Sequence, residues 1–196
     1  MVLRNPRVLR YAGGLPSSGY SLIELLTVIC ISAILLSLGS GFIDDSINRF
    51  KATQNISQLQ LLLADARAAA LFSNTKVSLC PLSSQGVCTN DWNQDLTLFT
   101  DSNHNRKLDT HETILQTFPA TLNNKTLRHF NNLAIGFDAN GFAAHSTGSL
   151  SYCYKERGTV GAVFIISRNG RIRHSKTTNA ENLPKTANGN DIPCPS

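Results

Sequence analysis

The chain has 196 residues, of which 41% are hydrophobic and 16% are charged, and its formal net charge is +5 at pH 7. This composition is globular and large enough for one hydrophobic core, which excludes a disordered or collagen-like chain. Three of the positive charges precede Gly19, where there are no acids, so the remainder carries only +2. A polyanion partner would therefore have to be recognised by a local cluster of charges, because the total charge is small.

Residues 25–43 contain no charged side chain. Nineteen such residues can cross a bilayer core about 30 Å thick as a helix. Arginines precede this segment, and the positive-inside rule then places the N-terminus in the cytoplasm and the rest in the periplasm. No A-x-A cleavage site follows the segment, which argues against an ordinary secretory signal. We therefore expect a single-pass anchor in the inner membrane, with residues 20–43 as a transmembrane or filament-core helix.

After residue 43 the pattern becomes amphipathic, with apolar residues three or four positions apart. This pattern predicts one long helix over about residues 21–72, with residues 44–74 as its amphipathic continuation. Two helices broken at Gly39–Gly41 are the alternative, because glycine weakens a helix interior. The apolar positions of the stripe are Ala52, Ile56, Leu59, Leu63, Ala66 and Ala70.

Residues 75–196 change to short alternating segments separated by Gly, Asn, Asp and Ser, a pattern typical of antiparallel strands. The expected fold class is therefore α+β, with a long N-terminal helix packed on a β-rich head. The tail from Thr177 onwards is polar and contains three prolines, and we expect it to be irregular. The predicted strands are 75–80, 95–100, 113–118, 125–130, 133–138, 148–154, 160–167 and 171–175.

Four cysteines lie in the head and none forms a CxxC pair, which disfavours a zinc ribbon or a thioredoxin-like site. In an exported protein an even set of four indicates two disulfides, with three possible connectivities. We favour Cys80–Cys88, because they are close in sequence, and Cys153–Cys194, because the tail needs a tether. The second bridge would stabilise the fold by roughly 4 kcal/mol in the chain-entropy model. Cys30, inside the apolar segment, is expected to be free.

A basic hairpin is predicted near the C-terminus, because Asn169-Gly170 is a two-residue turn signal between two strands. In that register Arg168 lies opposite Arg171, and Arg173 shares the face of Arg171. Residues 168–176 contain no acid and also include Lys176. Such a tip suits backbone phosphates, and it would bind DNA without sequence specificity. The alternative is that charge on an edge strand blocks aggregation.

Residues 101–112 resemble a calcium loop in their spacing. Position 6, where calcium loops have glycine, is Arg106, and it would need a strained turn there. We therefore favour a polar hairpin turn, whose side chains cap their own backbone, over a metal site, and the calcium loop is the alternative. No nucleotide-binding or hydrolase motif is present, so we expect neither enzymatic activity nor a cofactor. The residues at positions 1, 3, 5, 7, 9 and 12 are Asp101, Asn103, Asn105, Lys107, Asp109 and Glu112.

Residues 19–26 read Gly-Tyr-Ser-Leu-Ile-Glu-Leu-Leu and closely resemble the signature of type IV prepilins. The resemblance implies that residues 1–19 are a leader, cut between Gly19 and Tyr20 by a prepilin peptidase, and that Tyr20 becomes N-methylated. It also implies that Glu24 pairs with the terminal amine of a neighbouring subunit during assembly. The carboxylate of Glu24 and the amine of the neighbouring subunit would each be unfavourable alone in lipid, and they would pair when the subunits assemble. The proline that major pilins have near position 41 is absent.

The head resembles the FimT/GspH family of minor pilins, in the run Val77–Pro81 and in the later segments 99–105 and 165–173. Some FimT-type members resemble DNA-uptake components with a C-terminal G-R-x-R motif, which here is Gly170–Arg173. The family's frequent W-x-x-G is absent, because Asp95 replaces the glycine.

The resemblance implies a minor type IV pilin that assembles with major and minor pilins. It would also bind double-stranded DNA and support uptake in natural transformation, or competence. The alternative is a structural minor pilin or a type II secretion pseudopilin that primes filament assembly without binding DNA.

Overall fold

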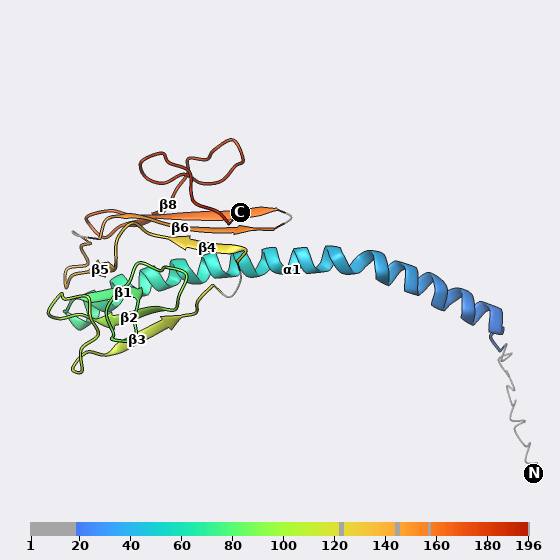
Figure 1. The fold of residues 1–196 in the computed structure, drawn as a ribbon, viewed down its shortest axis with the longest axis horizontal. Coiled ribbons are helices and arrows are strands. Elements are labelled where there is room, and N and C mark those ends of the chain that lie inside the picture. Colours follow the sequence, from blue (N-terminus) through green and yellow to red (C-terminus); the bar gives the residue numbers. More distant parts are fainter. Residues whose placement is uncertain (1–18, 122–123, 144–145, 157, 196) are drawn as a thin grey trace, which may run out of the picture. The chain divides into compact units, whose positions relative to one another are not determined.

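A computed structural model describes residues 19–121, 124–143, 146–156 and 158–195 (Figure 1). Residues 1–18, which make up nearly all of the predicted leader, lie outside the described residues. The chain divides into two compact units between Ile43 and Asp44, and each is considered by itself.

Helix α1 is continuous from Leu22 to Ser73, so the alternative of a break at Gly39–Gly41 is wrong. The Ser21 side chain begins the helix, because its Oγ accepts a hydrogen bond from the Ile23 amide at 3.3 Å, as an N-cap does. Glu24 lies in the first turn, where its negative charge is favourable for the helix dipole. Among the helical residues that the structure describes, no stretch is both long and apolar enough to cross a membrane.

Within the second unit, α1 contributes an apolar stripe to the core. Its predicted core positions are buried, except that Ile56 is only partly covered. The helix stops at Asn74, whose φ of 49° is the left-handed conformation that often follows a helix. The buried residues of this stripe are Ala52, Leu59, Leu62, Leu63, Ala66 and Ala70.

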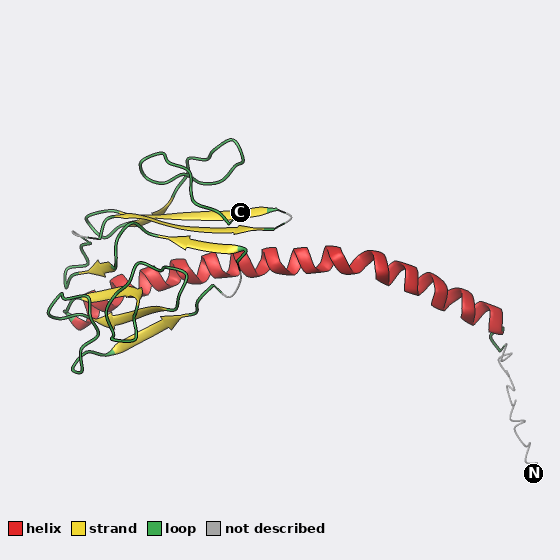
Figure 2. Cartoon of the chain, viewed as in Figure 1, coloured by secondary structure: helices red, strands yellow, loops and turns green. Residues whose placement is uncertain are grey.

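The other regular elements of the head form two antiparallel four-stranded sheets. Figure 2 shows their strands in yellow beside the red helix. The first has the order β3-β2-β1-β5 and the second has the order β4-β6-β7-β8. All eight predicted strands are present within two residues of their expected ends, and the α+β fold class is confirmed. The strands are β1 Val77–Pro81, β2 Leu96–Thr100, β3 Ile114–Phe118, β4 Thr126–His129, β5 Ile135–Phe137, β6 Gly148–Lys155, β7 Thr159–Ile166 and β8 Ile172–His174.

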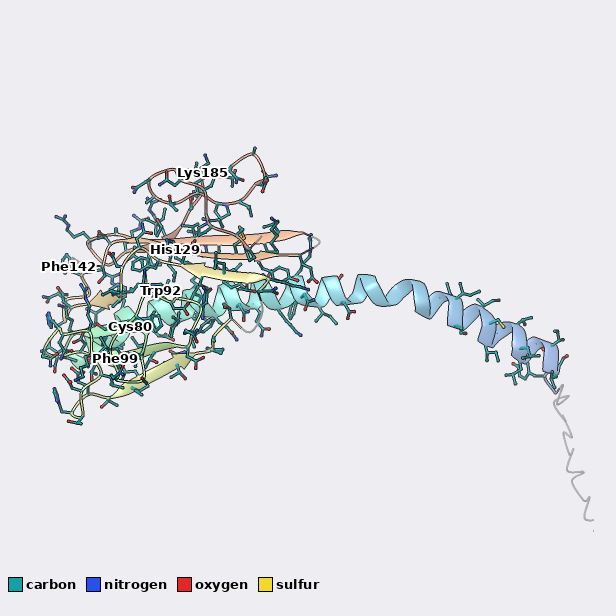
Figure 3. The ribbon with its side chains drawn as sticks, viewed as in Figure 1. Cys80, Trp92, Phe99, His129, Phe142 and Lys185 are labelled. Carbon is teal, nitrogen blue, oxygen red and sulfur yellow. A yellow bond between two sulfur atoms is a disulfide. The ribbon has the colours of Figure 1, made fainter. Side chains whose placement is uncertain are left out.

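One hydrophobic core joins α1 to both sheets. Trp92 is buried in this core (Figure 3). Its ring packs edge-on against Phe130 at 5.2 Å, and its indole N–H donates to the Asn132 carbonyl at 3.0 Å. Asp95, which stands where the family often has glycine, accepts a hydrogen bond from the Ala120 amide at 2.7 Å. The departure from the family pattern therefore serves to hold the segment that follows β3.

A smaller core lies on the other face of the second sheet, where the C-terminal tail covers Val163 and Ile165 of β7. The structure contains both disulfides of the favoured connectivity, Cys80–Cys88 and Cys153–Cys194. The second bridge ties the tail to β6 and brings Ile192 onto the sheet. Cys30 is free, as expected.

Candidate nucleic-acid interface

The connection between β7 and β8 differs from its prediction. The Ser167 amide donates to the Arg171 carbonyl at 3.0 Å, and the Gly170 amide donates to the Ser167 carbonyl at 2.9 Å. Residues 168–170 therefore form a three-residue loop, which we call the basic tip, and Ser167 stands opposite Arg171. The predicted pairing of Arg168 with Arg171 is wrong, because Arg168 lies inside the loop.

Two contacts explain the longer loop. The Asn169 Oδ1 atom accepts hydrogen bonds from the Ser167 hydroxyl at 2.6 Å and from the Arg171 amide at 3.3 Å, so Asn169 caps the loop. Gly170 has a φ of 72°, and a Cβ built on it would lie 1.8 Å from the Gly141 carbonyl oxygen. Gly170 thus supplies both a left-handed backbone and a close approach to a distant turn.

The backbone of the basic tip is held by its neighbours. Arg67 of α1 donates from Nε to the Gly141 carbonyl at 3.1 Å and from Nη2 to the Asn169 carbonyl at 3.4 Å. The Ala143 amide donates to the Arg168 carbonyl at 3.0 Å. Sequence reasoning did not select Arg67 for the site, because its role depends on two turns that meet only in the folded head.

The cationic side chains of this region are exposed: Arg168, Arg171, Arg173 and Lys176. Arg173 pairs with Ile165 across the strands, and alternation along β8 places Arg171 on the same outer face. Within the described part of the chain, no carboxylate lies within ion-pair distance of these four side chains. The arrangement therefore offers a group of unneutralised donors on a fixed backbone.

His174 belongs to a different surface. Its Nε2 atom lies 2.8 Å from the Gln60 Oε1 atom of α1, and its ring is 4.8 Å from that of Phe164. The imidazole is thus turned towards the helix, away from the face that carries Arg171 and Arg173. Although it lies within the basic segment, His174 is not part of the exposed cationic group.

In the acidic loop of residues 101–112, the side chains form hydrogen bonds with one another and with the backbone of the loop. Asp101 is buried, and its Oδ2 atom accepts from the Ser78 hydroxyl at 2.5 Å and from the Arg106 amide at 3.3 Å. Asn103 and Asn105 both donate to the Asp109 Oδ2 atom, at 2.9 and 2.8 Å. These two hydrogen bonds, with Asn103 making the larger contribution, lower the pKa of Asp109.

Glu112, at position 12 of this loop, accepts hydrogen bonds from the amides of Ser102 and Asp109 at 2.9 and 3.1 Å. Arg106 has the left-handed backbone that its position demands, with a φ of 57°. The arrangement is that of the favoured interpretation, in which polar side chains cap the backbone of their own turn.

Two residues of this turn, Asp109 and Glu112, also have ligand atoms within 4.8 Å of each other and of a ring nitrogen of His111. His111 was not among the candidate residues selected from the sequence. The local spacing of these three residues was the signal in the sequence.

The predicted processing residues lie at the start of the described part of the chain. Tyr20 and Glu24 are exposed, and Gly19 and Tyr20 precede the N-cap of α1. Their roles in cleavage, methylation and assembly depend on an enzyme and on other subunits, so these roles stay predictions.

Comparison with known proteins supports one family. Residues 55–170 match the model of the family described as type II transport protein GspH. No curated protein matches the chain. Two crystal structures of the type IV minor pilin FimU from Pseudomonas aeruginosa strain PAO1 are similar at 19% identity, with TM-scores of 0.48 and 0.44. The first match covers 65% of this chain and 90% of that one, and the second covers 63% and 91%.

The assignment rests on the family model, because it spans more than half of the chain. It agrees with the pilin-like order of a long helix followed by antiparallel sheets. The chain therefore belongs to the GspH family of pilin-like proteins.

Proposed function

We propose that this chain is a minor pilin that binds DNA non-specifically through the basic tip and supports DNA uptake in natural transformation. The observation that carries the proposal is the group of four exposed cations, Arg168, Arg171, Arg173 and Lys176, on a backbone held by Arg67 and Gly141. A rigid backbone lowers the entropy that binding costs. Arginine matches the geometry of a phosphate with two parallel N–H groups.

The proposed contact is with the phosphate backbone of double-stranded DNA. A hairpin tip of this size presents side chains to phosphates and does not place a helix in the major groove, so it reads no bases. One head should bind weakly, and several heads on one filament should bind more tightly through effective concentration.

For assembly, we propose that a prepilin peptidase cuts between Gly19 and Tyr20, that Tyr20 is N-methylated, and that Glu24 pairs with the terminal amine of a neighbouring pilin. The uncharged residues 25–43 would hold the precursor in the inner membrane with the head in the periplasm. Mass spectrometry of the N-terminal peptide tests this directly. A mature chain that begins at Met1, or after Ile43, would contradict the proposal.

Titration of the full chain, in a neutral detergent, with duplex DNA at several salt concentrations tests the DNA proposal. Neutralising three or four phosphates gives a slope of log affinity against log salt of roughly −3. Arg171→Gln and Arg173→Gln should each make this slope less negative by about 1 and weaken binding at low salt. Duplexes of scrambled sequence should compete equally.

Lys155→Gln is the matched control, because Lys155 is exposed and ends β6 opposite Thr159, the end of β7 remote from the basic tip. Lys125 is less suitable, since it forms an ion pair with Glu156. If the tip variants bind DNA like the parent, or if the control loses as much, then the tip is not the site. The alternative function, a structural minor pilin or secretion pseudopilin that primes assembly, would then be favoured, because it needs Glu24 but not the arginines.

A further inference from the structure

A cavity of about 300 Å³ lies within the second unit, between α1 and the second sheet. Its walls include Lys51 and Asn55 from α1, Phe118 at the end of β3, Ala120 just after that strand, and Arg128 from β4. We call it the Arg128 pocket. Its volume is at the lower end of the range of small-molecule sites. It lies apart from the basic tip, with which it shares no lining residue.

Arg128 is only 2% exposed, which is unusual for an arginine. Its Nη2 atom donates to the carbonyl oxygens of Asn93 and Gln94, at 3.2 and 2.7 Å. The Nε and Nη1 atoms are also buried, and they have no hydrogen-bond partner among the residues that the structure describes. The guanidinium thus uses one of its three nitrogens and leaves two without an acceptor.

The charge on Arg128 is retained in this setting. Burial lowers the pKa of Arg128 to about 10, so the side chain is still a cation at neutral pH. The ring of Phe118 lies 5.3 Å from the guanidinium carbon and offsets part of the lost hydration through a cation–π contact. An aromatic face cannot accept a linear hydrogen bond from every N–H, and buried donors without acceptors are unfavourable.

The rest of the pocket has matching chemistry. Lys51 adds a second positive charge. The acid next to the described lining residues, Glu156, already accepts hydrogen bonds from Tyr154 and Asn48. Phe118, Tyr152 and Tyr154 supply aromatic walls. Asn55 donates to the Tyr152 hydroxyl at 3.4 Å, which places further polar groups at the wall. Two cations with aromatic surroundings favour a ligand that has an anionic end and an apolar body.

We propose that the Arg128 pocket binds a carboxylate group carried on a small apolar or aromatic body. The carboxylate would accept hydrogen bonds from the unused nitrogens of Arg128 and would be attracted by Lys51. Because both nitrogens are buried when the pocket is empty, the walls must part slightly as the ligand enters. The source of the carboxylate is either a free small acid or an acidic residue of another protein chain.

The test uses the ¹⁵N-labelled full chain in a neutral detergent, titrated with benzoate and, in parallel, with the uncharged benzamide. The side-chain Nε–H resonance of Arg128 should shift with benzoate, with a dissociation constant on the order of millimolar. Benzamide should bind at least about tenfold more weakly, because it has no negative charge. Inorganic phosphate should also bind more weakly, because it lacks an apolar body for the aromatic walls.

Two variants locate the ligand without disturbing Arg128. Ala120→Phe, at a partly exposed wall, should fill the pocket and abolish the shift. Lys51→Gln, at an exposed position, should weaken benzoate binding severalfold. Arg173→Gln, a variant of the basic tip, should leave it unchanged, so this proposal and the DNA proposal can fail separately.

A blocked peptide that contains one glutamate separates the two sources. Tighter binding of that peptide than of benzoate would identify a protein carboxylate as the occupant, and the reverse order would identify a free acid. No benzoate shift, equal binding of benzamide or phosphate, or unchanged binding by Ala120→Phe would overturn the proposal.

Discussion

The two sheets each carry one polar loop and one disulfide, yet the loops present their charges differently. Between β2 and β3, the acidic loop uses its own carboxylates and amides as acceptors for neighbouring N–H groups. Between β7 and β8, backbone carbonyl oxygens and the Asn169 side chain accept the hydrogen bonds of the backbone amides of the basic tip. The arginine side chains are therefore not used as caps, and they are exposed to solvent. Aspartate and asparagine are short acceptors that readily cap a nearby backbone, whereas arginine can only donate. A charged loop is thus available to a partner when its backbone is satisfied by other groups.

The largest expected difference between the two sheets is in how much their disulfides contribute to the free energy of unfolding. Cys153–Cys194 spans 41 positions and Cys80–Cys88 spans 8. In the chain-entropy model, replacing both cysteines of a bridge by alanine should cost about 4 kcal/mol for the long bridge and about 2.6 kcal/mol for the short one. Chemical denaturation of the two double variants measures this. Equal losses would show that the tail is held mainly by its apolar contacts.

Replacing glycine by alanine should cost more stability in the basic tip, where Gly170 is packed, than in the turn at Gly189, which has open space around it. Gly170→Ala puts a methyl group against the Gly141 carbonyl and keeps a left-handed backbone, so the free energy of unfolding should fall by roughly 2–3 kcal/mol. Gly189→Ala is the matched control, since Gly189 has a φ of 81° but no atom within 4 Å of its added Cβ. The free energy of unfolding of the Gly189→Ala variant should fall by only about 1 kcal/mol. A similar loss at both positions would mean that the contact with Gly141 is not made.

The smallest expected effect concerns the acidic loop. Removal of the Asn103 amide by Asn103→Ala should raise the pKa of Asp109 towards its ordinary value, because one of the hydrogen bonds that favour the carboxylate is lost. In the parent, the pKa of Asp109 is lower in the folded chain than in the unfolded chain, so its carboxylate stabilises the fold at pH values above the unfolded-state pKa. That stabilisation is lost as the pH falls through the folded-state pKa. Carboxyl ¹³C shifts recorded during an acid titration give the value. An unchanged pKa in the variant would show that the loop does not hold Asp109 as described.

Local patterns determined much of this protein from its sequence. Apolar spacing predicted α1, alternation with turn residues predicted the eight strands, and the positions of the head cysteines favoured the two disulfides that the structure contains. These features depend on residues that are close in the chain or, for the disulfides, on few possible pairings. The exposure of the arginines at the tip also followed from a local pattern.

Contacts between distant residues were decided only by the tertiary structure. Gly170 meets Gly141 across 29 positions, and that contact, together with the Asn169 cap, accompanies a three-residue loop in place of the expected two-residue turn. Asp101, which the sequence places at position 1 of a possible calcium loop, is buried against Ser78 of β1. The Arg128 pocket needs α1, β4 and β6 together. Turn propensity acts between neighbours, whereas burial and unsatisfied hydrogen bonds depend on which surfaces the folded chain brings into contact.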